Sequence, residues 1–179
     1  MLSAAAPMAH PDREDPTLSL KSTSQDHHAR LEPHVDRLLV LAEMVGRVDC
    51  SAIHAVFEEE YSFIVGQLVP HMEAIESTLY DQLERLMGQR HSMEPMRQEH
   101  REMARLIEEM GRYRGHVEGC RLSAVEGLAL RRVLYRLHSI LKVHLAEEEL
   151  YLGVLDQNLS DEEKGVLARG IDHAMTEPL

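Results

Sequence analysis

Four histidines recur at positions where a helical reading of the sequence places apolar residues. His28, His71, His100 and His144 each fall in a separate segment of helical periodicity, on a stripe that otherwise holds leucine, isoleucine, valine or methionine. Glu148 follows His144 by four residues and therefore lies on the same helix face. A single core histidine is more often a hydrogen-bonded packing residue than a ligand. One in each of four segments indicates a shared role.

These residue types are those of a metal site without sulfur. A carboxylate in an apolar seam costs several kcal/mol unless it is paired or bound to a metal. No lysine or arginine falls on the inner stripe near Glu148 to pair with it. Imidazole nitrogens and carboxylate oxygens suit iron, manganese or zinc, and helical bundles hold two-metal carboxylate sites in their cores.

The elements that must position these residues are four long amphipathic helices. Gly46 and Gly88 are predicted to end the first and second of them. The sequences SAVE (123–126) and SDEE (160–163) are capping boxes, and the second begins a short final helix. The predicted long helices are Ser24–Val45, Ser51–Met87, Met93–Tyr113 and 123–156. Their number and short links predict an all-α fold, an up-down-up-down four-helix bundle.

The length of 179 residues suits one well-buried domain with terminal extensions. Residues 1–22 are rich in Pro, Ala, Ser and charge, and are predicted to be a disordered lead-in. The bundle is expected over 23–160. Residues 161–179 are expected to form the short C-terminal helix and a tail.

The charge balance and the cysteines narrow the class of protein. The chain has 31 acidic and 19 basic side chains and a net charge of -12. Neither nucleic acid nor an anionic membrane is therefore expected as a partner. No apolar run reaches about 18 residues, and the N-terminus lacks a secretory pattern, so a cytoplasmic location is predicted. Cys50 and Cys120 lack CxxC spacing and are expected to be isolated thiols in a reducing compartment.

The order of residues in the motifs separates two families of bundle. Ferritin-like proteins place the carboxylate first, as Glu-x-x-His, whereas here histidine comes first in HLAEE, residues 144–148. With DHHARLEPH (26–34), LVPHMEAIESTLY (68–80) and MRQEHREM (96–103), this order resembles the hemerythrin-like (HHE cation-binding) family over about 24–160.

That resemblance implies a set of metal ligands. His28, His71, His100 and His144 would be terminal ligands, and Glu148 would bridge two iron ions joined by an oxo or hydroxo group. Spacing alone does not separate iron from manganese or zinc.

The second helix departs from the family pattern HxxxE, because Ile75 stands where the second bridging glutamate is expected. Glu76 is the predicted replacement, provided that a kink at Pro70 or a π-bulge rotates it inward. Glu73 points further away and is the weaker candidate. A site without this second bridge is the remaining alternative.

Two further positions stay open. Oxygen-carrying relatives place another histidine one turn after His100, and that position is Ala104 here. Water is one replacement for it. The side chains considered as replacements are His138, Tyr61, Tyr80 and Tyr135. On the first helix, His27 and His34 are alternatives to His28.

The resemblance and the incomplete ligand set together predict a reaction with a small oxidant: hydrogen peroxide, nitric oxide or oxygen. A peroxidase-like reaction is preferred, because an open metal position favours reaction over reversible carriage. The electron donor is not identified. The alternatives are a non-catalytic protein that binds or senses oxygen or iron, and a metal-free structural bundle.

Overall fold

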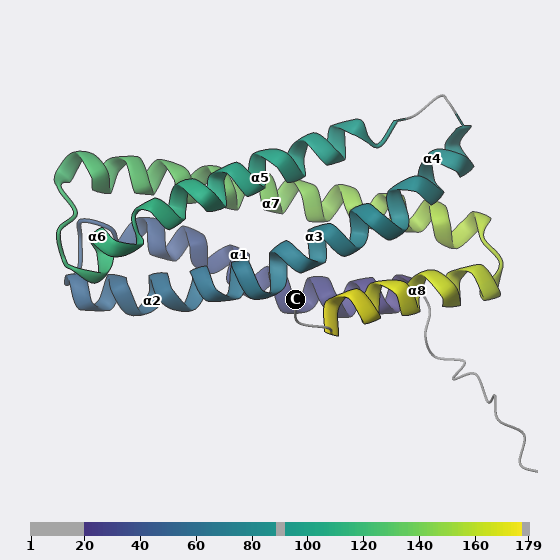
Figure 1. Ribbon diagram of the computed structural model, residues 1–179, viewed down its shortest axis with the longest axis horizontal. Helices are drawn as coiled ribbons and strands as arrows, with labels where there is room; N and C mark the ends of the chain where they lie inside the picture. The colour runs from purple at the N-terminus through teal and green to yellow at the C-terminus, as the bar shows by residue number, and fades with distance from the viewer. Residues whose placement is uncertain (1–19, 89–91, 177–179) are drawn as a thin grey trace, which may run out of the picture.

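The computed structural model describes residues 20–88 and 92–176, and every regular element within these ranges is a helix. Figure 1 shows the long helical segments lying lengthwise beside one another. The elements are α1 (Leu20–Met44), α2 (Cys50–Phe63), η1 (Ile64–Leu68), α3 (Val69–Ile75), η2 (Glu76–Tyr80), α4 (Asp81–Met87), α5 (Glu94–Arg112), α6 (Arg114–Glu118), α7 (Ala124–Asn158) and α8 (Asp161–Thr176). The all-α class is thus confirmed, while the up-down-up-down order stays a prediction.

The second predicted helix is continuous in space but changes its winding twice. The segments η1 and η2 are π-helical turns inserted between the α-helical pieces α2, α3 and α4. In η1 the backbone N–H of Val69 bonds the carbonyl of Ile64, five residues back. This wider turn directly precedes Pro70, which has no N–H to continue the α-helical ladder. The predicted irregularity at Pro70 is therefore present as a π-helical turn.

The helix ends follow the sequence signals. Gly46, two residues after the end of α1, and Gly88, directly after α4, adopt positive φ angles of 78° and 61°. At the start of α7, the Glu126 carboxylate accepts from the Ser123 N–H at 2.9 Å, and the Ser123 hydroxyl accepts from the Glu126 N–H at 3.2 Å. The same reciprocal pair joins Ser160 and Glu163 before α8. Both capping boxes are therefore confirmed.

The two ends of the chain differ from expectation. The N-terminal lead-in lies outside the described residues as far as residue 19, whereas residues 20–22 belong to α1 rather than to a disordered segment. The final helix, expected to be short, has 16 residues. It packs along α1 and α3 (Figure 1), because Leu167 and Ile171 face a buried apolar cluster. In the described part of the chain, no helix is long and apolar enough to cross a membrane.

The cysteine prediction is wrong. Cys50 at the start of α2 and Cys120 in the segment after α6 form a disulfide, with Cα atoms 5.6 Å apart. Seventy residues separate them in sequence, and the fold brings them together at one end of the molecule. The two cysteines therefore give no argument for a reducing compartment, and the cytoplasmic location stays a prediction.

Candidate metal centre

The predicted histidines form a polar layer between two apolar clusters. The larger cluster includes Leu68, Met103 and Leu141, and the smaller one includes Ile75, Met96 and Leu152. On each of three helical segments, the histidine lies between a residue of one cluster and a residue of the other. The residues of this histidine layer are His28, His71, His100, His144 and Glu148, and all are buried.

Glu148 is the centre of the histidine layer. Its Oε1 lies 3.2 Å from Nε2 of His28, and its Oε2 lies 3.6 Å from Nε2 of His71 and 3.7 Å from Nε2 of His144. Only 2% of the residue is exposed. One carboxylate thus faces imidazoles from α1, α3 and α7, as its position on the inner stripe predicted.

A second group of donors lies beside this carboxylate. The Nε2 atoms of His100 and His144 are 3.0 Å apart, and the hydroxyl oxygen of Tyr80 lies 3.1 Å from Nε2 of His100. Tyr80 is buried in η2 and its ring stacks on that of His100. Of the four side chains proposed to replace a missing ligand, Tyr80 is the one whose oxygen contacts a histidine of the layer.

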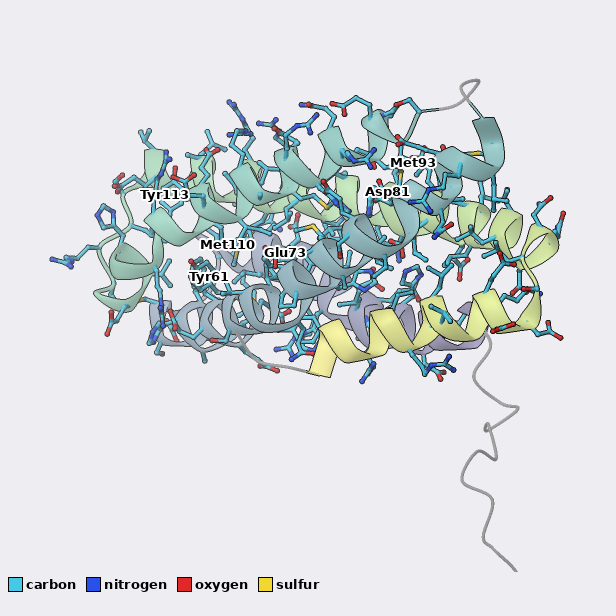
Figure 2. All side chains as sticks on the ribbon, turned by 45° about the vertical axis from the view of Figure 1, so that its right-hand side comes forward. Tyr61, Glu73, Asp81, Met93, Met110 and Tyr113 are labelled. Atoms are coloured by element: carbon cyan, nitrogen blue, oxygen red, sulfur yellow. A yellow bond between two sulfur atoms is a disulfide. The ribbon has the colours of Figure 1, made fainter. Side chains whose placement is uncertain are left out.

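The other three proposed replacements have partners elsewhere. His138 is 3.8 Å from Asp36, and the Tyr135 hydroxyl bonds Glu43. Tyr61 stacks on Phe57, and Figure 2 shows it near Met110 and Tyr113, towards the α6 end. Ala104 itself is exposed, while the neighbouring Met103 points into the core. A histidine at 104 would therefore not point into the layer in this structure.

Two carboxylates contact the Nδ1 atoms of His100 and His144. Glu76 Oε2 lies 2.9 Å from Nδ1 of His100, and Glu99 Oε2 lies 2.8 Å from Nδ1 of His144. A carboxylate at Nδ1 fixes the proton there and leaves Nε2 free to bind a metal. Glu99 was not predicted, although it directly precedes His100 in MRQEHREM. Its link is to His144 on another helix, which no spacing within α5 reveals.

Ile75 and Glu76 lie where the π-helical turn η2 begins. With the extra residue in this turn, the Ala74 carbonyl accepts hydrogen bonds from the hydroxyls of Ser77 and Thr78, at 3.1 and 2.6 Å. Ile75 is fully buried in the smaller apolar cluster. The predicted π-bulge is therefore present, and the carboxylate of Glu76, its first residue, contacts His100. That side chain is 40% exposed, and the bridging role stays a prediction. Glu73 is exposed, as expected.

On α1 the structure favours His28 over both alternatives. His34 stacks on Phe63 and bonds the buried carboxylate of Glu60 at 2.9 Å. His27 is buried and its ring centre lies 6.3 Å from that of His71, but its Nδ1 contacts Arg30 at 2.5 Å. His28 contacts Glu148 directly, with its Nε2 at 3.2 Å from Oε1.

Burial controls the protonation of this layer. Burial lowers the pKa of His144 to about 4, although the negative charge of Glu148 acts to raise it. Burial also lowers the pKa of His100, although the hydrogen bond that Glu76 accepts from it acts to raise it. Burial also raises the pKa of the Tyr80 hydroxyl, and the charge of Glu148 adds to this effect. For Glu148, burial alone would raise the pKa, but the charges of His71 and His28 hold it below its usual value. Neutral imidazoles at His100 and His144 beside an ionised Glu148 are the protonation states that bind metal.

The layer also contains polar atoms without partners. Both ring nitrogens of His71 and Oε2 of Glu148 are buried without a hydrogen bond. Buried polar atoms in folded proteins are nearly always satisfied, so each such case needs an explanation. His28, His71 and Glu148 offer atoms within 4.8 Å of one another, a group that could hold a metal ion. Ligands at about 2.1 Å from one ion lie about 3 Å apart, so these residues fit a bound cation with small adjustments.

The fold and the layer together define an all-helical protein with a buried histidine and carboxylate site for a cation. The chain belongs to the hemerythrin HHE cation-binding domain family, whose model matches residues 22–155. No curated protein and no solved structure matches the chain.

Proposed function

We propose that the histidine layer holds two iron ions and that the protein reacts with a small oxidant, with hydrogen peroxide preferred. The observation that carries this proposal is the position of Glu148 between two groups of donors. Its Oε1 faces His28, and its Oε2 faces both His71 and His144, with His100 beside His144. A carboxylate shared in this way is suited to bridging two ions.

The proposed ligands are nitrogen and oxygen atoms only. They are His28, His71, His100, His144, Tyr80 and Glu148, with Glu76 and Glu99 as the partners that orient two of the imidazoles. This donor set suits iron, with manganese and zinc as competitors. It also leaves metal positions for water or an oxidant, which is the arrangement of reactive metal sites. Bound ferrous iron would supply the two electrons that reduce hydrogen peroxide to water.

The protein's own contribution is a preorganised site enclosed by apolar residues. Ile75, Met103 and Leu141 are fully buried around the layer and exclude bulk water. Glu76 and Glu99 hold the Nδ1 protons of His100 and His144, so that both Nε2 atoms are available to metal without rearrangement.

The test is the metal content of protein from iron-supplemented cells, measured by mass spectrometry. About two irons per chain are expected in the wild type, as in other two-metal bundles. Glu148→Gln should lose most of this iron, whereas Glu149→Gln, an exposed neighbour, should retain it. Peroxide consumption should rise in proportion to bound iron.

Other results would favour the alternatives. Stoichiometric iron without consumption of peroxide or nitric oxide would indicate a binding or sensing protein. No stoichiometric metal, with a melting temperature that a chelator leaves unchanged, would indicate a structural bundle, because no binding free energy would then be linked to folding.

A further inference from the structure

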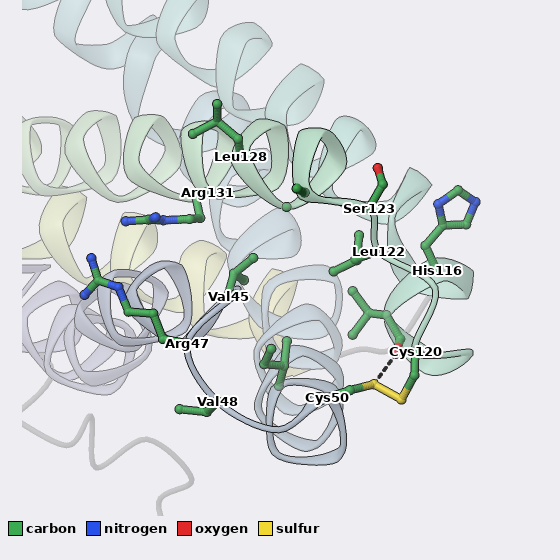
Figure 3. Close-up of a pocket in the computed structure, with 15 residues that line it drawn as sticks. Val45, Arg47, Val48, Cys50, His116, Cys120, Leu122, Ser123, Leu128 and Arg131 are labelled. Carbon is green, nitrogen blue, oxygen red and sulfur yellow. Dashed lines mark hydrogen bonds between the residues drawn. A yellow bond between two sulfur atoms is a disulfide. The ribbon is translucent and has the colours of Figure 1, made fainter.

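A pocket of about 590 Å³ lies at the end of the molecule where α2 and α7 begin (Figure 3). The Cys50–Cys120 disulfide forms part of its wall. Val45, Ile53 and other apolar side chains supply most of the remaining surface. Its fifteen lining residues include two arginines, Arg47 and Arg131, and none of them is acidic. The pocket does not include any residue of the histidine layer.

The disulfide is open to attack from one side. Cys120 is exposed, whereas Cys50 is partly buried, so an incoming thiol reaches the Cys120 sulfur more easily. Cys120 also has a φ of 52°, a left-handed conformation that favours glycine or asparagine over other residues. Disulfides that are exposed and held in strained loops are the ones that exchange readily with thiols.

Cys50 is placed to leave as a thiolate. It is the first residue of α2, and Asp49 at the N-cap makes no side-chain hydrogen bond to the first turn. The unpaired N–H groups of a helix N-terminus stabilise a thiolate. A stabilised thiolate is also the better leaving group in thiol–disulfide exchange.

The arginines give the pocket a preference for anions. Arg47 and Arg131 share a single carboxylate, that of Glu43, which also accepts a hydrogen bond from Tyr135. In addition, Nε of Arg131 is buried without a partner. Figure 3 shows both arginines across Val45 from the disulfide. The lining residues thus carry positive charge on a chain whose net charge is -12.

We propose that this pocket is a thiol–disulfide exchange site for small thiols that carry a carboxylate. The carboxylate binds at Arg47 and Arg131, and the thiolate attacks the sulfur of Cys120. The Cys50–Cys120 bond breaks, a mixed disulfide forms on Cys120, and Cys50 leaves as a thiolate. A second thiolate of the same kind then attacks the mixed disulfide. It releases Cys120 and the oxidised small disulfide, so two electrons pass from two thiols to the protein.

The first experiment compares two small thiols of opposite charge, 3-mercaptopropionate and cysteamine, on the oxidised, iron-loaded full-length protein under anaerobic conditions. Each rate of disulfide reduction is divided by the thiolate concentration and by the rate constant of the same thiolate with a small uncharged disulfide, so that differences in thiol pKa and in intrinsic nucleophilicity cancel. The anionic thiol should react roughly tenfold faster at low salt, and high salt should remove the difference. Arg131→Gln should also remove it. Arg112→Gln, which deletes an exposed arginine paired with Glu108, should leave it unchanged.

The second experiment traps the intermediate. Cys50→Ser treated with oxidised glutathione should accumulate a mixed disulfide on Cys120, whereas Cys120→Ser should modify Cys50 several-fold more slowly. If either variant fails to fold, the wild-type rates with the two thiols decide the matter. Equal or faster reaction with cysteamine would overturn the proposal, as would failure of oxidised glutathione to form the Cys50–Cys120 bond in the wild type.

Discussion

The hydroxyl of Tyr80 lies 3.1 Å from Nε2 of His100, the ring nitrogen that also faces His144. The oxygen is thus at the separation expected of two ligands on one ion. A tyrosine in this position would supply the donor that a histidine in place of Ala104 was expected to supply, and it comes from a different helical segment. The relationship depends on η2, which places Tyr80 on the inner face.

If Tyr80 binds iron, Tyr80→Phe should remove a visible absorption band of the ferric protein that arises from phenolate-to-iron charge transfer. The fold should survive, because the substitution removes only one buried hydroxyl, a cost of about 1 kcal/mol. Absorption spectra and thermal melts of the iron-loaded protein would show both effects. Tyr61→Phe, which alters a tyrosine outside the layer, is the control. An unchanged spectrum in Tyr80→Phe would remove Tyr80 from the ligand set.

The contact of Glu76 with Nδ1 of His100 favours a role in orienting that imidazole over the bridging role predicted from the sequence. Glu76→Ala should keep the metal stoichiometry and weaken the affinity by roughly 10- to 100-fold, as for other partners that orient a ligand. Competition with a chelator measures this change. Glu73→Ala removes an exposed carboxylate from the same helix and should have no effect. Loss of metal as complete as in Glu148→Gln would instead make Glu76 a ligand.

Restoring the family's glutamate at position 75 should damage the protein. Ile75 is fully buried among apolar residues that include Leu152 and Ile171. Ile75→Glu should lower the free energy of unfolding by about 3–5 kcal/mol, because it buries a charge without a partner. Ile75→Val should cost only about 1 kcal/mol. Urea unfolding of the metal-free proteins makes the comparison. A stable Ile75→Glu protein with increased metal content would show that this position can reach the ions.

The metal-free protein should lose stability as the pH falls from 7 to 5. Burial lowers the pKa of His144 to about 4 in the folded state, against about 6.5 in the unfolded chain. Between these values the unfolded state binds more protons, so acidification favours unfolding. His144 alone should contribute a loss of about 2 kcal/mol over this interval, and His100 acts in the same direction. Denaturant unfolding at several pH values tests this, and a flat profile would contradict it. His144→Gln should reduce the slope.

Periodicity in the sequence was enough to identify the long helices and the histidines that face inward. The 3.6-residue repeat assigns His71, His100 and His144 to apolar stripes whatever their neighbours are. The helix ends at Gly46 and Ser123 follow from local backbone chemistry, which acts within a few residues. The sequence alone is enough to predict helix periodicity and helix ends, because both depend on interactions between residues that are close in sequence.

Contacts between helices were decided only by the tertiary structure. Glu99 bonds a histidine on α7, Tyr80 reaches a histidine on α5, and Cys50 meets Cys120 across 70 residues. No spacing rule within one helix predicts these pairs, because they depend on the rotation and offset of one helix against another. The turn η2 adds one residue to a turn of its helix and so rotates the helical residues on its C-terminal side. The sequence by itself therefore determined which helices form and which faces they bury, while packing decided which side chains on those faces meet.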